Sequence, residues 1–201
     1  MADPTRRVFF SFHYQRDIWR AQQIKNHWVT KDSKVAAGFF DGSLEEKAKK
    51  EGDLSVKRLI NQGLHGASVT CVLVGEETYQ RRWVDYEIFK SIEVGMGVFG
   101  VRIHQLRDRQ TQQDNPGGNP FTYLGYGTRE NSDKMWPMIN YSTGWKDAPL
   151  NDAIYETSAP YLIKKDLPIL NSLFPVYDWV GDNGYDNFGY WVINAANHAG
   201  R

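Results

Sequence analysis

The sequence is poor in the residues that form disulfides and metal sites. It has one cysteine, Cys71, so no disulfide can form within the chain. Cys71 lies in the apolar run of residues 69–74, which favours a buried, unreactive thiol over a nucleophile. None of the five histidines is spaced from another as in a metal site, so we expect neither a metal nor another cofactor.

The chain also lacks net charge and long apolar runs. Its 24 Lys and Arg residues balance 24 Asp and Glu residues, so no overall charge draws it to nucleic acid or to an anionic membrane. No run approaches the roughly 20 apolar residues of a membrane span, and residues 1–7 lack the apolar stretch of a signal peptide. We therefore expect a cytoplasmic protein that binds neither nucleic acid nor membrane.

The balance of charge conceals two unlike halves. Residues 1–110 hold 18 basic and 14 acidic residues, whereas residues 111–201 hold 6 basic and 10 acidic ones and most of the tryptophan and tyrosine. A loop rich in proline, glycine and amide side chains, residues 110–120, lies between them. Because 201 residues suit about one domain, we predict a core over residues 1–110 and an aromatic-rich extension, residues 111–201, packed on the same domain.

The first half alternates short apolar runs with helical patterns. This alternation is typical of a parallel sheet covered by helices on both faces. We therefore predict an α/β fold with a doubly wound, mainly parallel sheet of the flavodoxin type. Its strands are expected at residues 8–12, 38–41, 69–74 and 98–103.

Helices are predicted between these strands and again near the end of the chain. Apolar residues recur at helical spacing from Ile18 to Trp28 and from Val56 to Leu64, and residues 43–46 have the form of a capping box. A further helix is expected over residues 79–93. In the second half we predict a strand at 134–141 and a closing helix at 186–197. The extension is expected to wall the site or to form a self-association surface, which would make the protein a homo-oligomer.

Ligands bind such sheets at the carboxyl ends of the strands, which directs attention to residues 11–14, 41–43 and 75 onward. A glycine-rich stretch, residues 95–100, matches the dinucleotide fingerprint G-x-G-x-x-G letter for letter. It closes a helix and leads into a strand, however, so the helix end would present carbonyl groups to a phosphate. We interpret it as a helix-terminating turn.

The most informative segment lies on the predicted helix 79–93. Trp83 and Glu87 are one helical turn apart and share a face, while Val84, Ile88 and Ile92 form the adjacent apolar stripe that would pack on the sheet. The aromatic ring and the carboxylate therefore point together toward the mouth of a site. Taken alone, such a W-x-x-x-E pattern is typical of a surface glutamate beside a half-buried tryptophan.

The order of these segments resembles the Toll/interleukin-1 receptor (TIR) domain over residues 6 to about 105. The likeness rests on the strands Arg7–Phe12 and Ser68–Gly75, on Thr78-Tyr79 and on Trp83-x-x-x-Glu87. The chain is more closely similar to the TIR-like proteins of bacterial Thoeris anti-phage systems. That likeness rests on residues 9–14, 26–30, 37–41, 68–73 and 81–84, and in the second half on residues 119–126 and 176–180.

The resemblance implies an enzyme that cleaves NAD at the nicotinamide–ribose bond, with Glu87 as the catalytic residue. NAD is then a substrate and no cofactor is needed. Nicotinamide leaves NAD as a neutral molecule, so a single carboxylate that stabilises the developing oxocarbenium charge can suffice. The family further implies a cyclic ADP-ribose signal that diffuses to a partner effector protein, and a phage-derived protein as the trigger. Some relatives instead join ADP-ribose to an amino acid, and this alternative stays open.

The expected substrate-binding residues surround Glu87 at the strand ends: Phe10, Ser11, Phe12, His13, Asp41 and Trp83. Aromatic rings can stack on nicotinamide or adenine, and Ser11 and Asp41 can hold hydroxyl groups. Two alternatives stay open, since one phenylalanine can belong to the core and His13 to a solvated turn. The pair Arg81-Arg82 is a further candidate for the pyrophosphate.

Three other classes of protein share this type of sheet. A TIR adaptor that only binds partners needs no carboxylate at Glu87. A response-regulator receiver needs an acidic pair after the first strand to hold magnesium, and this chain has residues 11–14, Ser-Phe-His-Tyr, at that place. A flavodoxin needs a loop rich in glycine and hydroxyl groups there, which this sequence lacks.

Overall fold

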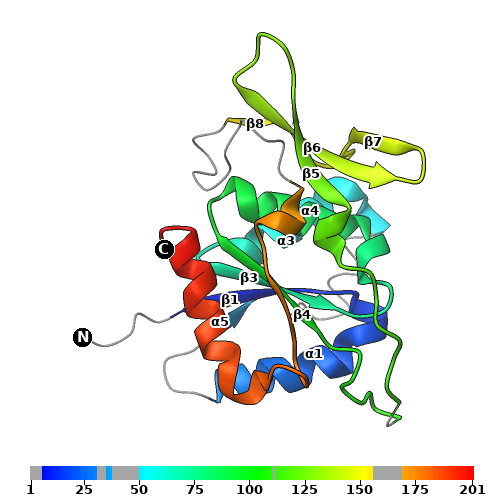
Figure 1. Ribbon diagram of the computed structural model, residues 1–201, viewed down its shortest axis with the longest axis vertical. Helices are drawn as coiled ribbons and strands as arrows, with labels where there is room; N and C mark the ends of the chain where they lie inside the picture. Colours follow the sequence, from blue (N-terminus) through cyan, green and yellow to red (C-terminus); the bar gives the residue numbers. More distant parts are fainter. Residues whose placement is uncertain (1–5, 31–34, 38–49, 111, 156–168) are drawn as a thin grey trace.

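The computed structural model describes residues 6–30, 35–37, 50–110, 112–155 and 169–201. Its centre is a parallel sheet with the strand order β2-β1-β3-β4-β9 (Figure 1). This is the order of a flavodoxin-like sheet, which confirms the predicted α/β fold. The elements of the sheet and its helices are β1 (Arg7–Ser11), α1 (Tyr14–Val29), β2 (Val35–Ala37), α3 (Asp53–Leu64), β3 (Val69–Val74), α4 (Arg82–Glu93), β4 (Gly97–Arg102), β9 (Val176–Asp178) and α5 (Gly184–His198).

Helices cover both faces of this sheet because its strands are apolar on both sides. All six residues of β3 are buried. On one face α1 and α5 pack on side chains such as Phe10 and Cys71, and on the other face α3 and α4 pack on Phe9 and Val72. Figure 1 shows the sheet crossing the centre, with α1 below it, α5 along its left side and α3 and α4 above it. The buried Cys71 thiol has a pKa raised by burial, in agreement with a structural role.

The predicted elements are largely confirmed, with shifted ends. The first and last predicted strands begin and end one residue earlier in the chain, as β1 and β4, and the closing helix is α5. The predicted helix at 79–93 begins only at Arg82. Thr78 is the reason: its hydroxyl accepts from the Gly75 amide at 2.9 Å and donates to the Leu73 carbonyl at 3.2 Å, which folds residues 78–80 into a 3-10 turn, η1 (Thr78–Gln80). The expected strand at 38–41 and the capping box at 43–46 lie outside the described residues.

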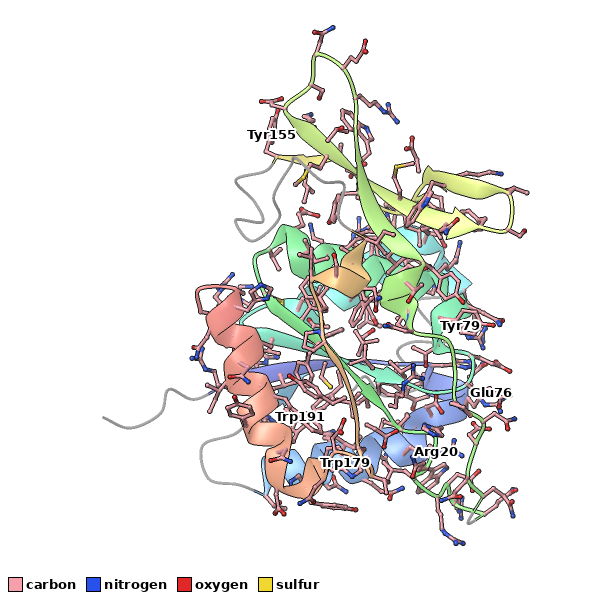
Figure 2. The ribbon with its side chains drawn as sticks, in the orientation of Figure 1. Arg20, Glu76, Tyr79, Tyr155, Trp179 and Trp191 are labelled. Carbon is pink, nitrogen blue, oxygen red and sulfur yellow. The ribbon has the colours of Figure 1, made fainter. Side chains whose placement is uncertain are left out.

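The second half leaves the parallel sheet and then returns to it. It first forms a separate antiparallel sheet, in which the predicted strand at 134–141 is confirmed as β6. Residues 176–178 then pair with β4 as the fifth parallel strand, which the sequence analysis missed. Figure 2 places Tyr155 of β8 at the far end of the antiparallel sheet, away from the parallel one. The elements of this half before β9 are η2 (Pro120–Thr122), β5 (Leu124–Thr128), β6 (Lys134–Tyr141), β7 (Gly144–Asp147), β8 (Ile154–Tyr155) and η5 (Leu170–Ser172).

An aromatic cluster joins α5 to the rest of the core. Phe188 is fully buried, and its ring lies 6.0 Å from that of Phe10 on β1 and 5.3 Å from that of Trp28 on α1. The rings of Phe99 and Trp179 lie 5.8 and 5.6 Å from it. The two halves of the chain thus share one core. Within the described ranges no helix combines the length and apolarity needed to cross a bilayer.

Phe188→Ala should lower the free energy of unfolding by about 3–5 kcal/mol, because it leaves a cavity where both halves of the chain meet. The matched control is Tyr190→Ala on the same helix, where the side chain is 65% exposed and the expected change is within about 0.5 kcal/mol. Denaturant unfolding of both variants tests this. Equal losses in the two variants would contradict the assignment of Phe188 to the shared core.

Candidate active site

A cleft of about 410 Å³ opens at the carboxyl end of β1, between α3 and the start of α4. This volume lies within the range of small-molecule sites. Four of the predicted site residues line it together with Glu87: Phe10, Phe12, His13 and Trp83. The W-x-x-x-E pattern and the rule that ligands bind at the carboxyl ends of strands therefore point to the same cleft.

Glu87 is held at this cleft by the first strand. The Ser11 hydroxyl donates to Oε2 of Glu87 at 2.5 Å, across a separation of 76 residues in the chain. Ser11 is fully buried, so its hydroxyl lies behind the carboxylate. We had expected Ser11 to hold a substrate hydroxyl. Its contact in this structure is with Glu87, whose carboxylate it orients by a charge-assisted hydrogen bond.

A second hydroxyl fixes the backbone of α4 at the same residue. The Ser91 hydroxyl donates to the Glu87 carbonyl at 2.6 Å and lies 2.7 Å from the hydroxyl of Thr70 on β3. Thr70 and Ser91 are both fully buried. The Thr70–Ser91 contact joins helix to sheet inside the core, where the apolar stripe Val84, Ile88 and Ile92 also packs, and together they fix the rotation of α4 about its axis. Glu87 faces the cleft as a result.

The aromatic residues divide between core and cleft. Phe10 is 1% exposed and stacks on Phe188 in the core, although it also lines the cleft. Phe12 is partly exposed and its ring lies 6.1 Å from that of Tyr14, which also lines the cleft. Trp83 is partly exposed beside Glu87. The structure thus places Phe10 mainly in the core, whereas Phe12 and Trp83 line the cleft as partly exposed residues.

His13 lies in the wall of the cleft and its side chain is 10% exposed, which excludes the alternative of a solvated turn. It lies against the guanidinium group of Arg81, with Nη2 at 3.2 Å from Nδ1 and also in contact with Nε2. Since a guanidinium group can only donate, the imidazole accepts. Arg81 is 3.7 Å from Glu77, and Arg82 pairs with Asp53 at 2.5 Å. The two arginines bring positive charge to the start of α4, where the helix dipole adds to it.

The last of the predicted site residues, Asp41, lies outside the described residues. Val56, Leu59 and Ile60 of α3 supply an apolar wall of the cleft, which could not be predicted from the sequence. Their periodicity signalled only a buried helix face, since a stripe that meets a cleft has the same spacing as one that meets the core. All the described residues that line this cleft belong to the first half of the chain.

The loop that follows β4 is tied to the same edge of the sheet by Arg16 of α1. Arg16 donates to Asp114 at 2.7 and 2.9 Å and to Glu77 at 2.9 Å, and it also contacts Glu76. The hydrogen bond from Arg16 lowers the pKa of Asp114 to about 2. Gly117 of this loop packs so closely on the Gly75 carbonyl that a side chain would collide with it. Figure 2 shows Arg20, Glu76 and Tyr79 along this edge.

Asp85 lies on the same helix as Glu87 but faces away from the cleft. Its side chain is 9% exposed, and burial raises its pKa from 3.8 to about 7. Within the described part of the chain it has neither a hydrogen-bond partner nor a paired cation. We did not consider Asp85 from the sequence, because its surroundings come from the second half.

The chemistry of the cleft is that of one oriented carboxylate among aromatic rings and arginines. Among the described residues there is no group of three or more His, Cys, Asp and Glu side chains that could hold a metal ion. Glu87 is the carboxylate that lines the cleft. Such an arrangement can stabilise a developing positive charge on a bound ligand and hold its anionic groups at the arginines.

Comparison with known proteins finds a matching family model and a similar protein that spans nearly the whole chain. The model of the family described as Thoeris protein ThsB, TIR-like domain, matches residues 9–108. A protein of Bacillus cereus (strain MSX-D12), named ThsB1 and described as a candidate cyclic ADP-D-ribose synthase, is 46% identical over 198 residues. The match covers 93% of this chain and 98% of that protein, and so includes the second half.

Asp85→Asn should change the pH dependence of stability. The folded carboxyl group, with a pKa of about 7, keeps its proton where the unfolded one, with a pKa near 3.8, has lost it. The stability of the parent therefore falls as the pH rises from about 4 to about 7. Relative to the parent, the variant should gain about 3 kcal/mol between pH 5 and pH 8. Urea unfolding at both pH values measures this, and a pH-independent difference would contradict the buried, unpaired carboxyl.

Proposed function

Because this chain belongs to the TIR-like family of Thoeris ThsB proteins, we propose that it cleaves NAD at the nicotinamide–ribose bond and makes a cyclic ADP-ribose product. The observation that carries the proposal is the Glu87 carboxylate, oriented by Ser11 at the cleft beside Trp83. The similarity to the Bacillus cereus protein over most of the chain supports the class of product.

Glu87 acts on the bond-breaking step. The bond between ribose C1′ and the nicotinamide nitrogen breaks, and its electron pair leaves with nicotinamide, which becomes neutral. Positive charge then develops on the ribose ring, and the carboxylate stabilises it more strongly in the transition state than in the bound substrate. The leaving group needs no proton, so one carboxylate serves where most glycosidases use two.

The other groups of the cleft suit the remaining parts of NAD. Arg81 and Arg82, at the start of α4, can hold the pyrophosphate by charge-assisted hydrogen bonds. Trp83 and Phe12 present partly exposed rings on which nicotinamide can stack. His13, through its contact with Arg81, positions that guanidinium group. The apolar wall from α3 excludes water from one side.

The nucleophile that replaces nicotinamide decides the product. For a cyclic product, a hydroxyl group of the same NAD molecule forms the new bond to C1′ and loses its proton. Water would give linear ADP-ribose, and an amino acid would give a conjugate. Cyclisation requires that the folded substrate is held close and water is kept out. We propose that the product acts on a partner effector and that a phage-derived protein triggers its synthesis.

Glu87→Gln should lower the rate of nicotinamide release from NAD by about 100-fold or more, since the amide carries no charge to oppose the oxocarbenium ion. The matched control is Glu93→Gln on the same helix, where the carboxylate pairs with Lys90 at 2.6 Å outside the cleft. Release is measured with and without lysate of phage-infected cells, and mass spectrometry identifies the product. Full activity of Glu87→Gln would refute the mechanism, and no release by the parent in either condition would favour an adaptor.

Ser11→Ala should lower kcat about tenfold, because the Glu87 carboxylate loses the hydrogen bond that orients it. KM should change little, since Ser11 lies behind Glu87 and has no exposed surface. Ser68→Ala is the control, because that hydroxyl faces the Arg7 carbonyl at the other end of the strands. A change in KM alone would assign Ser11 to substrate binding.

A further inference from the structure

A second cavity, of about 370 Å³, lies on the other side of the start of α4. It is open to solvent and is lined by η1, α4 and Tyr123 and by the end of β6 and residues 148–151. It shares Gln80 and Arg82 with the cleft, so only the first turn of α4 separates the two spaces. Unlike the cleft, this cavity exists because the second half packs on the first.

Asp85 supplies the one acidic side chain among the residues that line this cavity. It is 9% exposed, and none of the described residues forms a hydrogen bond or ion pair with its carboxyl group. A buried carboxyl group without a partner is costly, and its charged form is the costlier one. A ligand that brings its own positive charge would remove this cost.

Arg82 is the one basic residue among the described residues that line the cavity, and it already has other partners. It pairs with Asp53 at 2.5 and 3.3 Å and lies over the ring of Trp83 at 4.8 Å. Lys57, outside the lining, donates to the carbonyl of the lining residue Leu150 at 2.5 Å and lies over the ring of Tyr86. Burial is the cause of the raised pKa of Asp85.

A pair of tyrosines lines the cavity together with Asp85. The rings of Tyr79 and Tyr123 stack with their centroids 5.3 Å apart, and both line the cavity. A carboxylate with aromatic walls suits a guanidinium group, which is planar, is weakly hydrated, stacks on rings and binds a carboxylate through two parallel hydrogen bonds. An ammonium group is more strongly hydrated and forms no such pair.

We propose that this cavity is a second binding site, in which Asp85 and the tyrosine pair Tyr79–Tyr123 take a guanidinium group. Such a group is carried by a free small molecule or by an arginine side chain of a protein partner. The site is separate from NAD cleavage, because Asp85 and Glu87 lie on different sides of α4. Binding of a ligand to this second site can therefore be measured without an assay of NAD cleavage.

The test is calorimetric titration of the full chain with three probes. L-argininamide represents the free small molecule, and a tripeptide with blocked ends and a central arginine represents the protein side chain. L-citrullinamide has nearly the same shape as L-argininamide but a neutral urea group. We expect saturable binding of L-argininamide and none of L-citrullinamide. Binding of the tripeptide as well assigns a protein arginine as the source, and its failure to bind assigns the free molecule.

Three variants locate the site. Asp85→Asn should weaken binding of L-argininamide about tenfold or more, because it removes the charge of the acceptor. Tyr123→Leu should weaken it without touching Asp85, and it serves as the independent variant. Glu87→Gln should bind as the parent does, so a failure of the NAD proposal leaves this result unchanged. A thermal melt of each variant confirms that it is folded.

Three results would overturn the proposal. The first is equal affinity for L-citrullinamide and L-argininamide, which would show that charge is not recognised. The second is unchanged affinity in folded Asp85→Asn, which would place the probe elsewhere. The third is the absence of saturable binding by both arginine probes.

Discussion

The rotation of helix α4 is the constraint on which the functional part of the molecule depends. The apolar stripe Val84, Ile88 and Ile92 packs on the sheet, and the Ser91 hydroxyl contacts that of Thr70 on β3. Ser11 on β1 then holds the Glu87 carboxylate. A helix turns by about 100° for each residue, so Asp85, two residues earlier, must face nearly the opposite way. One helix therefore presents two carboxyl groups to two cavities. A rotation of α4 by one residue, about 100°, would turn both carboxyl groups away from their cavities.

The parallel sheet and the main site could be predicted because their signals are local. Strand β3 is apolar throughout and is buried throughout, so composition alone marks it as central. Trp83 and Glu87 share a helix face by spacing, and the strand-end rule places His13 nearby. The contact between Ser11 and Glu87 spans 76 residues, and no local pattern contains it. Only the pairing of β1 with β3 brings the two side chains together.

The parts that could not be predicted depend on contacts between the two halves. Strand β9 has three residues, too few for a period, and it is a strand only because β4 offers it an open edge. The environment of Asp85 likewise follows from the position of Tyr123 and residues 148–151 beside α4. A stripe such as Val56 to Ile60 gives no sign of whether it meets core or cleft. Sequence periodicity shows which face of a helix or strand is apolar. The topology of the fold decides which element packs on that face.

The late return of the chain to the parallel sheet has a consequence for biosynthesis. Strand β4 ends at Arg102, but its neighbour β9 begins only at Val176, after the whole antiparallel sheet has been made. Until then the emerging polypeptide carries an apolar strand with an unpaired edge, which is a template for aggregation. A ribosome adds about 5–20 residues per second, so this edge stays open for several seconds. The long stretch of chain that separates β4 from β9 thus makes the pairing of this edge one of the last contacts of the sheet to become possible during synthesis.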